Sequence, residues 1–155
     1  MFSDDVYRSH LSDTIAALET WARSMVDCAK IDTEMQPSFW RMSVAPLASG
    51  PCPFELVLRA DQRFNARIGD EVYEDKPVDA FSFFPMLVRA IADGRVERVS
   101  IISALTGMLE VIETRVTLED GWAWIGERRL ATRSQRKSDA AQLQRTHPFL
   151  PYRRK

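Results

Sequence analysis

Apolar residues recur at intervals of three and four in the segment SDTIAALETWARSMVDCAK, residues 12–30. This spacing places them along one side of a helix. Ser12 and the earlier Ser3 are the two candidate N-caps, because a serine hydroxyl accepts a hydrogen bond from an amide of the first turn. We therefore predict an amphipathic helix that begins at one of these serines. Its apolar stripe consists of Leu11, Ile15, Leu18, Ala22, Met25 and Ala29.

After Pro37 the period changes to two, which is typical of strands that bury one face. The segments FWRMSVAP (39–46) and PFELVLRA (53–60) both alternate in this way, and a loop rich in proline and glycine joins them. The segment 62–75, QRFNARIGDEVYED, predicts a hairpin that turns at Gly69-Asp70. These patterns together predict three or four strands.

A second helix is expected to begin at Ser82, with Pro85 in its first turn and Gly94 closing it. Residues 96–118 are all suited to strands, but one strand of that length would span roughly 75 Å. We therefore predict that this stretch folds back at Thr106-Gly107. The resulting strands lie near 96–105 and 108–118, and a further strand carries Trp122 and Trp124.

The predicted order is one helix, three or four strands, a second helix and three strands. Consecutive hairpins with few helices favour an α+β fold. We expect an antiparallel sheet of about six strands, with the two main helices packed on one face. A chain of 155 residues suits one domain. We assign residues 1–132 to that domain and residues 133–155 to a basic C-terminal tail.

The last hairpin has two possible registers, which place Trp122 and Trp124 on different faces. If the loop holds only the Asp-Gly pair, both indoles share an exposed face with arginine, as a stacking platform would. If residues 119–121 form the loop, Leu118 opposes Trp122 and Val116 opposes Trp124. Burial of two indoles contributes several kcal/mol, more than a surface ion pair. We predict the second register, with both tryptophans in the core.

The formal net charge of −1 hides an uneven distribution. Residues 133–155 carry seven basic residues and one acidic residue, so the rest of the chain is acidic. Such a tail can contact phosphates, or it can dock onto its own domain or a partner subunit, in part as a short helix over 138–146 capped by Ser138. Its apolar residues favour docking. The candidate docking residues are Arg145, Phe149, Leu150, Tyr152, Arg153 and Arg154.

Motifs for catalysis and for metal binding are not evident. The two cysteines and two histidines have no zinc-site spacing, and neither a phosphate-binding loop nor a nucleophile elbow occurs. The acidic segment GDEVYED, residues 69–75, is interpreted as a solvated hairpin edge. We expect no metal and no cofactor, and the sequence favours a role other than catalysis.

The start of the sequence lacks the apolar core of a signal peptide, and IISALTGML is too short to span a membrane. We therefore expect a cytoplasmic protein. The leading hypothesis is a protein-interaction domain, which also pairs as a homodimer. The first alternative is a small-ligand-binding domain or enzyme with a pocket between sheet and helices. Its expected lining is Trp40, Phe83, Met86, Trp122 and Trp124. The second alternative is nucleic-acid binding through the tail.

Overall fold

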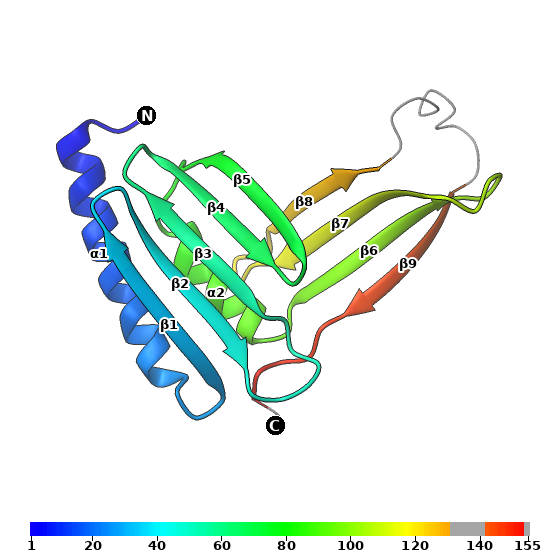
Figure 1. The fold of residues 1–155 in the computed structure, drawn as a ribbon, viewed down its shortest axis with the longest axis horizontal. Helices are drawn as coiled ribbons and strands as arrows, with labels where there is room; N and C mark the ends of the chain where they lie inside the picture. Colours follow the sequence, from blue (N-terminus) through cyan, green and yellow to red (C-terminus); the bar gives the residue numbers. More distant parts are fainter. Residues whose placement is uncertain (131–141, 154–155) are drawn as a thin grey trace.

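The computed structural model describes residues 1–130 and 142–153, which form two helices and nine strands (Figure 1). The first sheet has the order β1-β2-β3-β4-β5 and the second has the order β8-β7-β6-β9. All pairings within the two sheets are antiparallel, which confirms the α+β class, whereas the expected single sheet of about six strands is wrong. In chain order the elements are α1 (Asp4–Ser24), β1 (Ala29–Gln36), β2 (Phe39–Pro46), β3 (Phe54–Arg59), β4 (Arg63–Ile68), β5 (Glu71–Pro77), α2 (Phe83–Ala92), β6 (Val96–Ser103), β7 (Leu109–Thr117), β8 (Ala123–Arg129) and β9 (Gln142–Pro148).

Helix α1 uses the earlier of its two candidate caps. The Ser3 hydroxyl accepts a hydrogen bond from the Val6 amide at 3.4 Å, and the helix ends at Ser24. The predicted helix was therefore too long at its C-terminal end. Residues from Ala29 onward pair with β2 instead and form strand β1.

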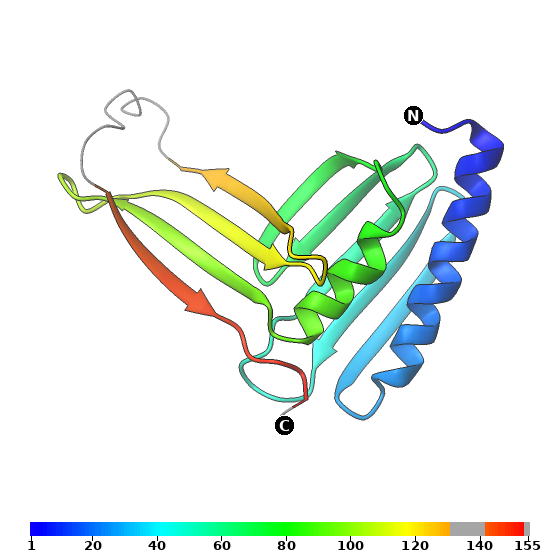
Figure 2. The same cartoon turned by 180° about the vertical axis from the view of Figure 1, so that it is seen from behind.

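The core lies between the first sheet and the two helices, which cover the same face of that sheet (Figure 2). Alternate residues of β2, β3 and β4 point toward the helices because a strand directs successive side chains to opposite faces. Helix α2 begins after Ser82 and is followed by Gly94, as predicted. The largest fully buried side chains include Leu18, Trp40, Phe54, Leu56, Phe84 and Ile91.

The second sheet does not extend the first because β5 ends as an irregular edge. The β4–β5 ladder shifts register between Phe64 and Ala66, and Asp75 adopts a positive φ of 57°. Bulges and prolines on an edge strand, here Pro77, discourage further pairing. Strands β7 and β8 instead contact β5 through their side chains. The Tyr73 hydroxyl lies 2.6 Å from the Thr114 hydroxyl in this buried contact.

The described part of the tail returns to the domain. Residues 142–148 form strand β9 on β6, so the part of the expected short helix that the structure describes is a strand. Residues 138–141 of that expected helix lie outside the described residues. After β9, the Tyr152 hydroxyl donates to the Cys52 carbonyl at 2.5 Å and the Tyr152 amide donates to the Ala92 carbonyl at 2.8 Å.

Candidate functional site

The tryptophan hairpin adopts the predicted three-residue loop. Val116 pairs with Trp124, and the Leu118 amide donates to the Trp122 carbonyl at 2.8 Å. Gly121 closes the loop at a φ of 91°, in the left-handed region that favours glycine. The register is therefore confirmed.

The expected burial holds for only one of the two indoles. Trp124 is half-buried, with its ring centroid 5.3 Å from that of Tyr73 and 6.3 Å from that of Phe83. Trp122 is 75% exposed, so the prediction of a core position for it is wrong. A shared strand face fixes the direction of a side chain, but only neighbours on that face bury it.

A cavity of about 350 Å³ lies beside Trp124, where the second sheet meets the start of α2. Strands β4 and β5, the loop before α2, the first turn of α2 and strand β8 all contribute to its wall. The residues that line it are Phe64, Lys76, Pro77, Asp79, Ala80, Phe83, Phe84 and Trp124.

The wall of this cavity is aromatic because three elements direct rings to one point. Phe64 lies on the inward face of β4, and its ring meets that of Phe84 edge-on, with centroids 5.1 Å apart. Phe83 lies beside both, 5.9 Å from Phe64 and 5.4 Å from Phe84. Trp124 completes the wall from the second sheet. Edge-on and tilted pairs of this kind hold their rings in defined orientations.

Charge is confined to the exposed rim of the cavity. Lys76, Pro77, Asp79 and Ala80 are all exposed, so half of the lining residues lie at the surface. One ammonium and one carboxylate thus flank an apolar interior. The arrangement suits a group that is apolar along its length and polar at its outer end.

Beyond the cavity, a polar contact joins the two sheets. Both carboxylate oxygens of Glu71 accept hydrogen bonds from the Arg128 guanidinium, at 2.8 and 3.1 Å. Arg128 holds the pKa of the Glu71 carboxyl below its usual value. The interpretation of residues 69–75 as a wholly solvated edge is therefore wrong at Glu71, which is 5% exposed. Burial raises the pKa of the neighbouring Tyr73 hydroxyl.

The five residues expected to line one pocket are only partly brought together. Phe83 and Trp124 line the aromatic cavity. Trp40 is fully buried and borders a separate space of about 210 Å³ between α1 and the β1–β2 turn. Met86 packs against the core, and Trp122 is exposed. The sequence offered one signal for the missing residues, the dense aromatic segment AFSFFP before and within α2.

The candidate docking residues of the tail are placed in different surroundings. Phe149 and Tyr152 pack against the core. Arg153 donates to the Asp27 carboxylate at 2.5 Å and to the Ser24 carbonyl at 2.6 Å. Leu150 is half-exposed, and Arg145 lies on the exposed strand β9. Arg154 lies outside the described residues.

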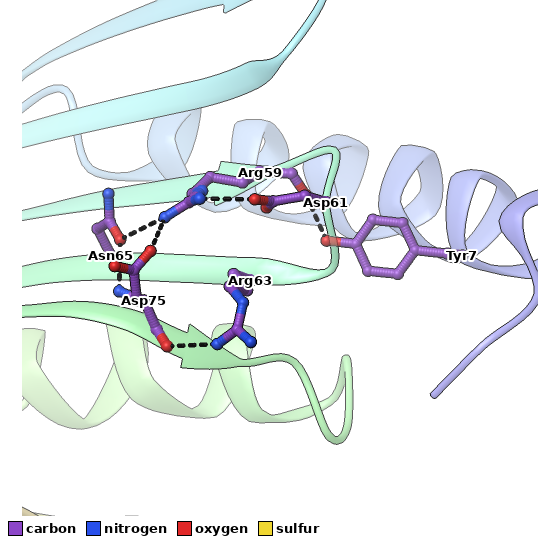
Figure 3. Close-up of polar contacts among 6 residues, drawn as sticks. All are labelled: Tyr7, Arg59, Asp61, Arg63, Asn65 and Asp75. Carbon is purple, nitrogen blue, oxygen red and sulfur yellow. Dashed lines mark hydrogen bonds and ion pairs between the residues drawn. The ribbon is translucent and has the colours of Figure 1, made fainter.

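A second polar cluster lies on the outward face of the first sheet (Figure 3). Arg59 pairs with both Asp61 and Asp75, and it also donates to the side-chain amide oxygen (Oδ1) of Asn65 at 3.4 Å. The Tyr7 hydroxyl donates to the Arg59 main-chain carbonyl at 2.5 Å. The Arg59 guanidinium is fully occupied by these partners, so the cluster fastens strand ends together.

Within residues 1–130 and 142–153, no group of three or more histidine, cysteine, aspartate and glutamate side chains is placed to hold a metal ion. Neither described helix is long and apolar enough to cross a membrane. Searches against protein-family models, curated proteins and solved structures found no match to this chain.

Proposed function

We propose that this protein is a protein-interaction domain whose aromatic cavity receives a large apolar side chain of a partner protein. The observation that supports the proposal is the cavity beside Trp124, with aromatic residues inside and exposed polar residues outside. Aromatic pockets of this kind hold the few anchor residues that contribute most of the energy of a protein interface.

The openness of the cavity favours a side chain over a free small molecule. Sites for small ligands commonly bury most of the ligand surface. Here four of the eight lining residues are exposed, so a bound group keeps one side toward solvent. A partner protein covers that side with the rest of its own surface.

Binding of a small molecule is the second candidate, because a volume of about 350 Å³ falls within the range of such sites. The exposed Lys76 ammonium at the rim suits an aromatic acid. This alternative shares the cavity with the main proposal and differs in how much of the bound group the protein surrounds.

The test fills the cavity without disturbing the core. Ala80 is exposed and lines the cavity, so Ala80→Phe occupies the space from its rim. Ala17→Phe, on the exposed side of α1, is the matched control. The fluorescent probe 1-anilinonaphthalene-8-sulfonate is expected to bind the wild-type protein and the control, and to lose binding to Ala80→Phe.

A displayed peptide library then distinguishes the two candidates. Peptides selected on the wild-type protein are expected to carry a large apolar residue and to bind Ala80→Phe about tenfold or more weakly, a loss of about 1.4 kcal/mol. If the dye binds but the selection yields no peptide whose binding is weakened by Ala80→Phe, the small-molecule alternative is favoured. Unchanged dye binding to Ala80→Phe would refute the cavity as the binding site.

A further inference from the structure

Strand β8 is an edge of the second sheet, and the hydrogen bonds to β7 show which of its backbone groups are free. Antiparallel ladders alternate between bonded and non-bonded pairs. The Leu118 amide donates to the Trp122 carbonyl, and the Leu130 amide donates to the Glu110 carbonyl. The backbone N–H and C=O groups of even-numbered residues from 122 to 130 therefore point toward β7. Odd-numbered residues from 123 to 129 direct their N–H and C=O groups outward, where no described strand pairs with them.

This edge carries exposed apolar side chains. Trp122 is 75% exposed and Ile125 is 53% exposed. Edge strands of monomeric proteins are normally protected by charge, proline, a bulge or a covering segment. Strand β5 is protected by its bulge and Pro77. The outward positions of β8 carry charge only in its second half, at Glu127 and Arg129, whereas its first half presents Ala123 and Ile125. The unpaired backbone groups of β8 and the exposed side chain of Ile125 together form a surface that a further strand can cover.

We propose that two copies of this chain pair through their β8 strands, antiparallel and about a two-fold axis that passes through Ile125. The second sheet of each copy then becomes one half of a continuous sheet. A two-fold interface of this kind uses the same surface on both copies and closes as a dimer. This inference does not depend on what occupies the aromatic cavity.

The side chains select this register over its neighbours. With the axis at Ile125, the two isoleucines lie opposite each other, which buries both exposed side chains. Ala123 then lies opposite Glu127, so no like charges meet. On the other face, Trp124 lies opposite Gly126, and Trp122 lies opposite Arg128, where an indole can accept the guanidinium on its ring.

The neighbouring registers are less favourable. An axis at Glu127 places two carboxylates opposite each other, which is destabilising. An axis at Gly126 places Ile125 opposite the Glu127 carboxylate and so covers the apolar side chain with charge. An axis at Trp124 overlaps only residues 123–125 of β8 in each copy, whereas the axis at Ile125 overlaps residues 123–127, because β8 begins at Ala123.

Cysteine cross-linking tests both the dimer and its register. Opposed residues of a hydrogen-bonded pair have Cα atoms about 5.5 Å apart, within the range that a disulfide spans. The cross-linking variants are made in a protein in which Cys28, which is partly exposed, is replaced by serine. Cys52 is kept, because it is fully buried and burial raises the pKa of its thiol to about 12. In this background, Ile125→Cys is expected to form a covalent dimer under mild oxidation.

The matched controls are Ala123→Cys and Glu127→Cys. Each alone is expected to stay largely uncross-linked, while a mixture of the two forms the mixed disulfide, because these positions lie opposite each other. Equal cross-linking by Ala123→Cys or Glu127→Cys alone would overturn the register. Cross-linking between Ile125→Cys and Glu127→Cys, in place of self-cross-linking, would also overturn it.

Sedimentation equilibrium on the unmodified full chain provides the second measurement. The wild-type protein is expected to dimerise reversibly, and Ile125→Lys is expected to raise the dissociation constant about tenfold or more while circular dichroism stays unchanged. Ala80→Phe is expected to dimerise as the wild type does, which separates this inference from the proposed function. A wild-type protein that is monomeric at all accessible concentrations refutes the inference.

Discussion

Glu71 lies where the two sheets meet, and its carboxylate is nearly inaccessible to water. A buried carboxylate is costly unless it is paired and hydrogen-bonded. Arg128 supplies both, from a strand 57 residues further along the chain. This one contact therefore joins β5 to β8, next to the ring contact between Tyr73 and Trp124.

Glu71→Gln is expected to lower the free energy of unfolding by about 1–3 kcal/mol near neutral pH, because it leaves Arg128 without its charged partner. The folded-state pKa of Glu71 is depressed, so the stabilisation is present above the unfolded-state pKa of about 4.3 and is lost as pH falls through the folded-state value. Urea denaturation between neutral and acidic pH checks this.

In that titration the difference between the wild-type protein and Glu71→Gln is expected to shrink below the unfolded-state pKa. Glu127→Gln is the control, since Glu127 forms an ion pair with Arg129 on the exposed side of β8 and such pairs contribute little. A stability difference at Glu71 that does not change with pH would contradict the assigned cause.

At the same scale, the residues of the turn predicted the hairpin register, whereas the apolar character of Trp122 did not predict its exposure. Gly121 and the apolar residues around it predicted the hairpin register correctly, because a one-residue slip exchanges the two faces of a strand. The exposure of Trp122 was not predictable in this way. It depends on how far the first sheet and α2 extend over that face, and no residue near Trp122 carries that information.

At the scale of elements, the segment after β9 fastens residues 149–152 to α2 and to the β2–β3 loop. Tyr152 is buried between α2 and the β2–β3 loop, and burial raises the pKa of its hydroxyl. The loop at Gly50-Pro51 meets the same segment, where the Leu150 amide donates to the Gly50 carbonyl at 3.2 Å. The apolar residues of the tail thus contact this chain's own core.

Two substitutions at Tyr152 separate its hydrogen bond from its packing. Tyr152→Phe is expected to cost about 1–2 kcal/mol of unfolding free energy, because the Cys52 carbonyl loses its donor. Tyr152→Ala is expected to cost about 3–5 kcal/mol, because it also leaves a cavity. Chemical denaturation monitored by circular dichroism measures both.

Arg153→Ala is the control for this pair, because Arg153 is half-exposed and bonds to groups at the surface. It is expected to change the stability little. If Tyr152→Ala were as mild as Arg153→Ala, the C-terminal segment would not be part of the folded core.

Strand β9 shows the limit of sequence patterns for elements. Its sequence QLQRTHP has no sustained alternation, and every side chain in it is exposed. The strand forms because β6 offers a free edge, which is a property of the tertiary structure. Strand β1 is similar, since the outer edge of β2 selects residues 29–36 as a partner although helical spacing continues to Ala29.

At the scale of the whole molecule, the unpredicted feature is the division into two sheets. Turn residues in the sequence indicate how many strands form, but they do not indicate which strand edges pair with each other. The irregular end of β5 prevents one continuous sheet, and the polar and aromatic contacts of Glu71 and Tyr73 then hold the second sheet across the first. The shared core nevertheless includes Val96 and Val116 of the second sheet.

A shared core predicts cooperative unfolding of both sheets. In native-state hydrogen exchange, the bonded amides of β3 and those at the inner ends of β6 and β7 are expected to open with the same free energy, equal to the global value. The amides near the 104–108 turn are expected to exchange more readily, because Leu105 and Met108 there are exposed. If the inner ends of β6 and β7 opened at a clearly lower free energy than β3, the second sheet would be a separate unit that unfolds while the helices stay packed on the first sheet.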